Sequence, residues 1–469
     1  MSATVSAPDR SVGLAPAATA APAMDRRTKA LLEAPLAGLL FRLAAPNVVL
    51  MLAQTATGLI ETYFIGMLGT DALAGVALVF PGIMLMQMIS AGSMGGGISS
   101  AVARALGSGR REDAQALVWH ALIINGTLGL ICTIGVLSFG EPLYRALGGE
   151  GASLQAALAY SNIIYAGAVL LWAMNALASV IRGTGNMLVP GGVICGGALL
   201  LIPLSPALIF GWGPFPRMGI AGGAIALIGY YVLGIVLQAI YLWGGYGVLR
   251  PGLTARLRKR MFSAILKVGA LASTTSIQTN LTIMMTTGMV GAFGAAALAG
   301  FGTGSRLEYL LVPISFGIGG PLVAIVGTNM GAGNRQRALR AAWIGGAFGF
   351  AITEAIGIAA ALFPQVWLSL FDTDPDMLRT GSLYLNIVGP FYGFFGLGLV
   401  LYFASQGAGR LLWPVAAQFF RLVTAVVGSW LALRLGGGLS AVFTMIGVAL
   451  AVFGVTVAGS IAGGSWRRG

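Results

Sequence analysis

The stretch that decides the fold is PNVVLMLAQTATGLIETYFIGMLGTDALAG, residues 46–75, in which a long apolar run is interrupted by the carboxylate Glu61. A membrane-spanning helix needs about 20 consecutive apolar residues, so this run predicts one. A carboxylate inside such a helix is costly unless it faces a cavity, a partner or a proton path. Glu61 is therefore the first candidate functional residue.

The whole composition extends this interpretation. The 469 residues are 57% hydrophobic and only 9% charged, with a mean hydropathy of +0.87. So few charges cannot cover the surface of a soluble protein, and the chain is predicted to be an all-α polytopic membrane protein. Twelve spans are expected, at residues 39–65, 72–100, 116–138, 157–181, 188–210, 219–243, 263–290, 296–328, 340–363, 382–404, 412–434 and 440–462.

The basic residues predict the topology. A net charge of +13 would suggest nucleic acid in a soluble protein, but here the arginines and lysines concentrate in alternate links between the apolar runs. This asymmetry places both termini in the cytoplasm and argues against a nucleic-acid partner. Residues 1–34, rich in Ala, Pro, Ser and Thr, predict a disordered cytoplasmic tail, and the basic link 246–267 predicts a cytoplasmic hinge.

An internal repeat divides the chain. Four segments recur in order: LGTDALAG (68–75) as FGAAALAG (293–300), GSGRREDA (107–114) as GAGNRQRA (331–338), AYSNI (159–163) as LYLNI (383–387), and RGTGNMLVP (182–190) as QGAGRLLWP (406–414). The displacement in numbering is 225 for the first pair and 224 for the other three. A duplicated unit with an even number of spans predicts two parallel six-helix lobes, 35–245 and 263–469. A binding cavity is expected between or within the lobes, near the membrane midplane.

Polar residues follow one face of the first span and of its repeat. Their spacing of three and four residues predicts that each set shares a helix face. The expected substrate-cavity residues are Gln54 and Thr57, beside Glu61, and Gln278, Thr279, Thr282 and Thr286. For the threonines, hydrogen bonding between helices is an equal alternative.

Other polar residues within the spans are secondary candidates. Arg306 and Glu308 point about 200° apart on a helix, so each needs a partner on another helix. Glu308 is a second coupling candidate, Arg306 is a cavity candidate, and the role of Glu354 stays open. Pro46 removes a backbone hydrogen bond and predicts a hinge in the first span.

Enzyme signatures are missing from the sequence. It has one histidine, His120, no pair of metal ligands at helical spacing, no G-x-S-x-G turn and no G-K-[ST] phosphate loop. No catalytic residue, metal or cofactor is therefore expected, and uphill transport would draw on a proton gradient or on Na⁺. An intramembrane enzyme would need a catalytic set that is not found, and a channel would be distinguished by its currents.

The residues resemble those of a known family. Residues 60–76, IETYFIGMLGTDALAGV, together with GSGRREDA, the Arg182-Gly-Thr-Gly motif and TNMGAGN (328–334), resemble the multidrug and toxic compound extrusion (MATE) family, over everything after residue 35. Glu61 stands where the family usually has Asp. The seventh and tenth spans lack the acids of some sodium-coupled members, so the chain is more similar to the DinF-like branch.

The resemblance implies a function. Such transporters have two six-helix lobes around a central cavity and export organic cations and other amphipathic compounds in exchange for protons or sodium. We expect proton-coupled export by a monomer in the cell inner membrane, with Glu61 as coupling carboxylate. A Na⁺-coupled exporter and a lipid-linked saccharide flippase of the same superfamily are the alternatives.

Overall fold

The protein is all helical over the residues that the structure describes. The computed structural model describes residues 25–466 apart from 254–255 and 372, and within its helices it leaves the side chains of 53–62 and 309 undescribed. No strand occurs in the described ranges. The fold class predicted from the sequence is confirmed.

The helices group into twelve spans along the described chain. The first six are α2 (Leu36–Gly66), α3 (Thr70–Gln87) continuing through η1 (Met88–Met94) and α4 (Gly95–Gly107), α5 (Arg111–Ala146), α6 (Gly151–Ala166) with α7 (Ala168–Gly183), α8 (Leu188–Phe210) and α9 (Ile220–Trp243). The second six are α10 (Lys259–Gly291), α11 (Ala295–Gly331), α12 (Arg335–Leu362), α14 (Pro375–Val388) with η2 (Gly389–Phe391) and α15 (Tyr392–Ala408), α16 (Leu412–Val423) with η3 (Thr424–Gly428) and α17 (Ser429–Arg434), and α18 (Leu439–Ala462). Two short helices, α1 (Arg26–Glu33) and α13 (Pro364–Leu368), lie outside these spans.

Length and composition support this count. Nine of the described helices are long and apolar enough to cross a membrane, and the pair α6–α7, bent by 48°, makes a tenth span. α2 and α10 complete the twelve. α10 carries a polar stripe, which lowers its hydropathy, and in α2 the apolar segment with described side chains is Leu36–Leu52.

The repeat predicted from the sequence is visible in the helix boundaries. α5 begins at Arg111 and α12 at Arg335, and α8 begins at Leu188 and α16 at Leu412. Both pairs of helix starts have the displacement of 224 that the later motifs show. The predicted spans 188–210 and 412–434 coincide with α8 and with α16–α17.

A π-helical segment explains why the displacement changes. It is 225 at the start of α3 and α11 (Thr70 and Ala295), but 224 at the ends of the same spans (Gly107 and Gly331). The first repeat thus holds one more residue, and η1, within this span, is a π-helix that accommodates it. In the second repeat α11 is α-helical throughout.

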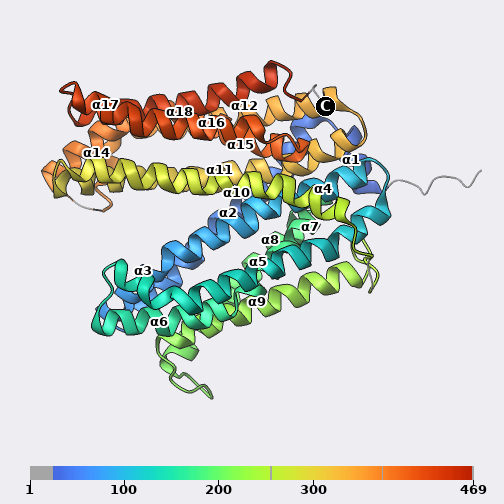
Figure 1. Cartoon of the computed structure of the whole chain (residues 1–469), viewed down its shortest axis with the longest axis horizontal. Helices are drawn as coiled ribbons and strands as arrows, with labels where there is room; N and C mark the ends of the chain where they lie inside the picture. Colours follow the sequence, from blue (N-terminus) through green and yellow to red (C-terminus); the bar gives the residue numbers. More distant parts are fainter. Residues whose placement is uncertain (1–24, 254–255, 372, 467–469) are drawn as a thin grey trace, which may run out of the picture.

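The two six-helix lobes meet at one end and diverge toward the other (Figure 1). The joined end holds α1, the end of α4 and the C-terminal end of α18; the diverging end holds α3, α6, α14 and α17. α2 crosses between the lobes: Leu40 and Ala44 belong to a core cluster with Ile318 and Leu322 of α11, whereas Ile65 belongs to the core of the first lobe. The lobe limits 35–245 and 263–469 stay predictions.

Close backbone contact fixes the joined end. A Cβ on Gly107 would overlap the carbonyl oxygen of Thr328, and a Cβ on Gly331 would overlap that of Arg104. Gly331 is the repeat counterpart of Gly107, and Thr328 is that of Arg104, so the contact is reciprocal between the repeats. Ser100 Oγ adds hydrogen bonds to the carbonyls of Gln406 (2.6 Å) and Gly407 (3.1 Å).

One part of the predicted disordered tail is ordered. Residues 26–33 form α1, because the side chain of Asp25 caps the amide of Arg27 and Leu31 is buried. Asn329 Nδ2 of α11 donates to the carbonyl of Leu31 at 3.0 Å, which fastens α1 to the joined end. Residues 1–24 of that prediction lie outside the described part of the chain.

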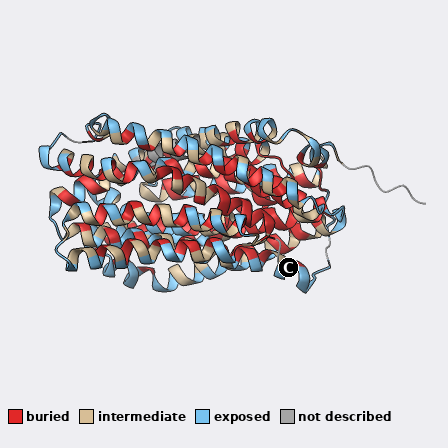
Figure 2. Cartoon of the chain, turned by 90° about the horizontal axis from the view of Figure 1, so that it is seen from above, coloured by how far each residue is buried: buried red, intermediate tan, exposed pale blue. Residues whose placement is uncertain are grey.

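The outer surface suits a lipid environment. Exposed positions run along the outside of the bundle and buried ones lie between the helices (Figure 2). Large apolar side chains on the outside are strongly exposed, for example Phe139 at 69% and Leu199 at 70%. Apolar groups at these positions are stable where lipid replaces water.

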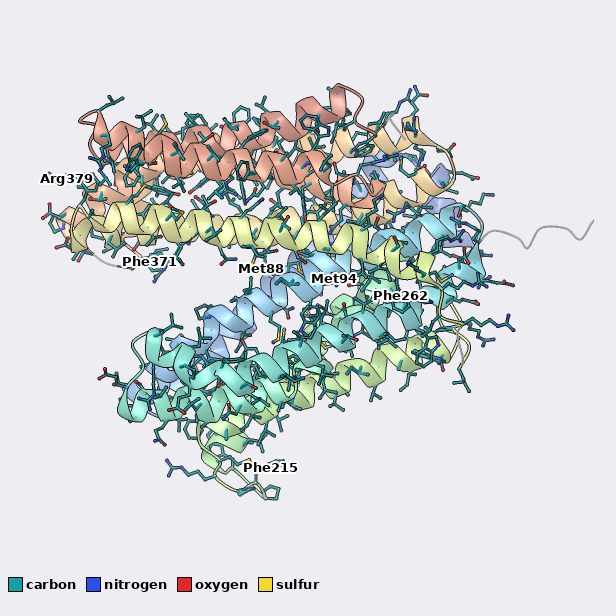
Figure 3. The ribbon with its side chains drawn as sticks, viewed as in Figure 1. Met88, Met94, Phe215, Phe262, Phe371 and Arg379 are labelled. Carbon is teal, nitrogen blue, oxygen red and sulfur yellow. The ribbon has the colours of Figure 1, made fainter. Side chains whose placement is uncertain are left out.

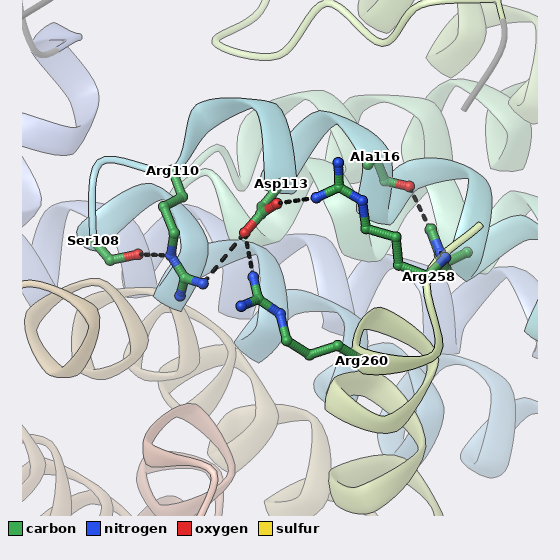
Figure 4. Close-up of polar contacts among 7 residues, drawn as sticks. Ser108, Arg110, Asp113, Ala116, Arg258 and Arg260 are labelled. Carbon is green, nitrogen blue, oxygen red and sulfur yellow. Dashed lines mark hydrogen bonds and ion pairs between the residues drawn. The ribbon is translucent and has the colours of Figure 1, made fainter. Parts of the chain in front are cut away.

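The link between the lobes, 246–267, is anchored to α5 by arginines that cluster around Asp113 (Figure 4). The Asp113 carboxylate pairs with Arg260 at 2.6 Å, Arg110 at 3.3 Å and Arg258 at 3.4 Å. His120 Nε2 accepts a hydrogen bond from the backbone N–H of Arg258 at 2.9 Å. These contacts hold the predicted hinge against the first lobe, and give His120 a structural role.

Asp113→Asn is expected to destabilise the protein by about 1 kcal/mol, because it leaves three guanidinium groups close together around a side chain that is only 16% exposed. Thermal unfolding of the purified protein measures the effect. Glu141→Gln, which breaks an exposed ion pair with Arg145, is the matched control and should change little. Equal melting temperatures for the two variants would contradict this role of Asp113.

Candidate functional site

A cavity of about 200 Å³ lies inside the first lobe. α3, α6, α7, α8 and α9 surround it, and Ile65 of α2 closes one side. Most of its wall is apolar. The polar lining residues are Tyr160, Tyr230, Tyr231, Gln87 and Asn175.

Two amides hold the polar part of this cavity together. Asn175 Nδ2 donates to Ser90 Oγ at 2.8 Å and to Gln87 Oε1 at 3.3 Å. Ser90 is fully buried in η1, so the extra residue of the π-helix lies beside the amide pair. Figure 3 shows Met88 and Met94, the ends of η1, where the two lobes part. π-helical segments frequently occur at functional sites, and this one contacts the cavity lining through the hydrogen bond between Ser90 and Asn175.

The chemistry of the cavity is that of a small-molecule site. Apolar walls with a few convergent polar groups bind a ligand by burying its apolar surface and orienting it through hydrogen bonds. Tyr230 and Tyr231, with ring centroids 5.4 Å apart, supply aromatic surface on which an organic cation can rest. Neither lysine nor arginine lines the described cavity wall.

The second lobe differs at the matching positions. By the repeat, Gln87 corresponds to Val312 and Asn175 to Leu399. Leu399 packs against three of the hydrophobic core clusters. The amide pair is therefore a feature of the first lobe, and its binding chemistry has no counterpart at these positions.

The second lobe instead holds a partly buried acid, Glu308 of α11. The hydroxyl of Tyr384 of α14 donates to Glu308 Oε1 at 2.5 Å. The side chain of Tyr392 is buried close by, within interacting range of Tyr384 and Glu308. Arg421 of α16 lies over the rings of Phe395 and Phe453, 5.3 and 5.9 Å from their centroids, within Coulombic range of Glu308 but without a direct ion pair.

The candidates on the first span fall in the undescribed part of α2. The side chains of Glu61, Gln54 and Thr57 lie outside the described residues, although the helix backbone there is continuous. Pro46 also lies within α2, and next to it Asn47 Nδ2 donates to the carbonyl of Gly317 of α11 at 3.0 Å. The hinge at Pro46 stays a prediction.

The threonines on α10 are bonded within the second lobe. Thr282 and Thr286 are buried and donate to the carbonyls of Gln278 and Thr282, each at 2.8 Å. Thr279 accepts from Gln418 Nε2 of α16 at 2.7 Å. Gln278 Oε1 is buried without a partner among the described residues. The roles of these residues in a substrate cavity stay predictions.

Arg306 and Glu354 also find partners on other segments. The guanidinium of Arg306 lies over the ring of Phe371, 5.4 Å from its centroid, and Figure 3 places Phe371 toward the diverging end. Glu354 Oε2 accepts from the backbone N–H of Gly393 at 2.7 Å. Glu308 meets Tyr384 of another helix, as expected, whereas the contact of Arg306, Phe371, lies in the turn after α13 and not on a helix.

Gln87, Asn175 and the three tyrosines were not identified from the sequence. An amide in an apolar span is a weaker signal than a carboxylate, because it carries no charge. Their common location requires three-dimensional proximity of α3, α6, α7 and α9. The displacement between the repeats changes from 225 to 224 within the span formed by α3, η1 and α4. This change was the one sequence signal of the π-helix next to Gln87 and Asn175.

Comparison with known protein families identifies the family to which this chain belongs. The sequence profile of the MatE family matches residues 46–207 and 272–431, one segment in each repeat. The chain belongs to the MATE family. MATE proteins are transporters, so the chain is a multi-pass membrane transporter.

Several MATE relatives share most of their length with this chain. A protein of Shewanella oneidensis named "FAD transporter" is 31% identical over 80% of this chain and 82% of its own. A protein of Thermotoga maritima named "Probable multidrug resistance protein NorM" is 28% identical over 82% of this chain and 83% of its own.

Solved MATE-like structures share the fold. A Pyrococcus furiosus transporter of the MOP superfamily, described as having a binding pocket of reverse polarity, superposes with a TM-score of 0.87 at 23% identity, covering 95% of this chain and all of that chain. An outward-facing multidrug resistance MATE transporter gives 0.83 at 23% identity, covering 94% and 97%. At these identities the likeness concerns the fold alone.

Proposed function

We propose that this MATE protein is a multidrug exporter that exchanges amphipathic or cationic organic compounds for protons, with Glu61 as the coupling carboxylate. The observation that carries the proposal is the first-lobe cavity, which reaches α2 at Ile65. Position 61 is one helical turn before Ile65 and shares its face.

The second repeat supports this placement. Ile65 corresponds to Val290, and both side chains are buried in the core of their own lobe. Thr286, which corresponds to Glu61 by the same displacement, is also buried. The position of Glu61 within the repeat is thus one whose described counterpart faces the lobe interior.

In the proposed cycle, a proton and a cationic substrate compete for the carboxyl group of Glu61. A buried carboxyl group is stable when it is neutral or when a cation compensates its charge. Proton binding from one side would therefore favour release of a cationic substrate there, and substrate binding from the other side would favour release of the proton. The lobes would diverge alternately at one end of the molecule and at the other. In this structure the lobes diverge at the end opposite the basic termini. This is an outward-facing state if both termini are cytoplasmic.

Glu308 is proposed as a second proton-carrying group. Its hydrogen bond from Tyr384 and the lack of a direct ion pair with Arg421 leave its carboxyl group free to change protonation. The DinF-like assignment, the monomeric state and the inner-membrane location are parts of the same proposal. Vesicle assays with Glu61→Gln, argued in the Discussion, test it.

Coupling to sodium and the flippase function are the alternatives. Export that follows a Na⁺ gradient at fixed pH would favour sodium. A flippase for lipid-linked saccharides has to hold a pyrophosphate, whereas the first-lobe cavity has no cationic side chain in its described wall. Rescue of a flippase-deficient strain would reverse this ranking.

Flavin dinucleotide export is a second candidate because of the 31% identical relative named for FAD. Vesicles that hold purified protein can be offered FAD or an organic cation dye under the same pH gradient. Uptake of FAD that exceeds uptake of the dye would make FAD the preferred substrate. The uncharged lining of the cavity favours the dye.

Asn175→Leu should weaken substrate binding about tenfold, because it puts the residue of the second lobe, Leu399, into the first-lobe cavity and breaks the bonds to Ser90 and Gln87. The concentration dependence of dye transport measures this. Asn125→Leu, which removes a buried amide bonded to the carbonyl of Trp172 outside the cavity, is the control. Similar losses in both variants would argue against a binding role for Asn175.

A further inference from the structure

A second cavity, of about 600 Å³, lies at the joined end of the second lobe between α10, α16 and α18. Its volume falls in the range of small-molecule sites, ~300–1,000 Å³. Two cations, Lys267 and Arg410, line it together with the hydroxyl residues Thr456, Ser460 and Ser465, and no acid is among the described lining residues. It is separate from the first-lobe cavity and from Glu308.

The start of α16 adds hydrogen-bond donors to this cavity. Leu411 provides no side-chain cap, so the backbone N–H groups of Leu412 and Trp413 have no acceptor among the described residues. Free N–H groups at a helix N-terminus attract anions. The third helical residue is Pro414, which has no N–H group. The cavity therefore combines side-chain cations with two unsatisfied backbone donors.

In the first repeat, side chains of the protein itself occupy the equivalent site at the start of α8. Asn186, the counterpart of Arg410, accepts from the N–H groups of Leu188 (3.1 Å) and Val189 (3.3 Å) through Oδ1. Its Nδ2 donates to the hydroxyl of Tyr241 at 2.9 Å. Counted from the starts of α9 and α18, Tyr241 matches Ser460. At the equivalent positions the second repeat thus has neither the amide acceptor nor the aromatic ring, and it has the cation Arg410 in place of Asn186.

The surroundings indicate what the cavity holds. Leu412 is 70% exposed and Trp413 49% exposed, so one side of the lining faces outward from the bundle. Exposed tryptophan beside basic residues is typical of the membrane–water interface. Basic pockets between membrane helices on the cytoplasmic side bind the head groups of anionic lipids.

We propose that this cavity binds the phosphate head group of an anionic phospholipid from the leaflet at the joined end, with Lys267, Arg410 and the amides of Leu412 and Trp413 as its ligands. Trp413 and Leu412 lie against the acyl chains. A lipid bound here joins α10, which packs against η1 and α4 of the first lobe, to α16 and α18, and so stabilises the joined form. The site goes beyond the proposed transport function and is independent of Glu61.

The test uses the detergent-solubilised full-length protein. Phosphatidylglycerol, phosphatidylcholine and inorganic phosphate are added separately, and lipid retention is read by native mass spectrometry and stability by thermal unfolding. Wild type should retain phosphatidylglycerol at least fivefold more strongly than phosphatidylcholine and melt at a higher temperature with it. Inorganic phosphate at the same concentration should have no effect.

Three variants separate the site from general attraction to a basic surface. Lys267→Gln removes one cation, and Ser460→Tyr restores the ring of the first repeat while it keeps both cations; each should lose most of the phosphatidylglycerol retention. Lys259→Gln, on the same helix outside the cavity, should bind like wild type. Equal retention by wild type and Ser460→Tyr would overturn the proposal, as would equal stabilisation by inorganic phosphate, which would indicate a soluble anion instead of lipid.

Discussion

Glu61→Gln in purified, reconstituted protein is expected to abolish uphill export driven by a pH gradient, with a loss of at least about tenfold. Glutamine preserves the size of the side chain but cannot release or bind a proton in the working pH range. The energetic reason is that a carboxyl group in an apolar span couples two ligands only if its charge changes during the cycle. The assay compares dye accumulation in vesicles with and without the imposed gradient.

Two further variants make this result specific. Glu61→Asp keeps the titratable group, one methylene shorter, and should retain proton-dependent export. Glu112→Gln, which neutralises an exposed carboxylate on α5, should export like wild type. Export by Glu61→Gln at the normal rate, with an unchanged response to the gradient, would reject Glu61 as the coupling residue.

Gly107→Ala is expected to displace the protein from the joined form and to lower transport about tenfold. Its new methyl group would overlap the carbonyl oxygen of Thr328, and backbone atoms cannot move aside as a flexible side chain does. Overpacking of this kind costs about 1–3 kcal/mol. A bias of that size changes the ratio of two states roughly 5–150-fold.

Distances across the joined end measure the displacement directly. Spin labels at the exposed positions Ser108 and Asn334, in a background without Cys132 and Cys195, should report a longer distance in Gly107→Ala than in the parent. Gly331→Ala should act alike, because the contact is reciprocal. Gly135→Ala, whose methyl group meets no atom within 4 Å, is the control. Unchanged distances and transport in both joined-end variants would disprove the account of this contact.

Much of the fold was predictable because the membrane imposes a simple rule on the sequence. Apolar runs of sufficient length become helices, and the runs 188–210 and 412–434 match helices in the structure residue for residue. Repeated motifs such as GSGRREDA and GAGNRQRA sit at helix starts, so their common displacement gave the two lobes. The helix α1 was missed because its partners, such as Asn329, which donates to the Leu31 carbonyl, lie in the other half of the chain.

The site was predictable only where it contains a charge. Glu308 stood out as an acid in an apolar span, but its partner Tyr384 lies 76 residues further along and shares no local pattern with it. Asn175 and Gln87 meet through the packing of α7 against α3 and η1. Periodicity assigns a residue to a face of its own helix, and the neighbouring helix on that face follows only from the packed structure.

Proton release on substrate binding tests the coupling most directly. Purified wild type in weakly buffered detergent solution is titrated with an organic cation dye, and the pH is followed over a series of starting values. Competition at Glu61 predicts that wild type releases protons as the dye binds and that Glu61→Gln binds the dye without releasing that proton. Equal proton release by both proteins, or dye binding to wild type with no release at any starting pH, would contradict the account.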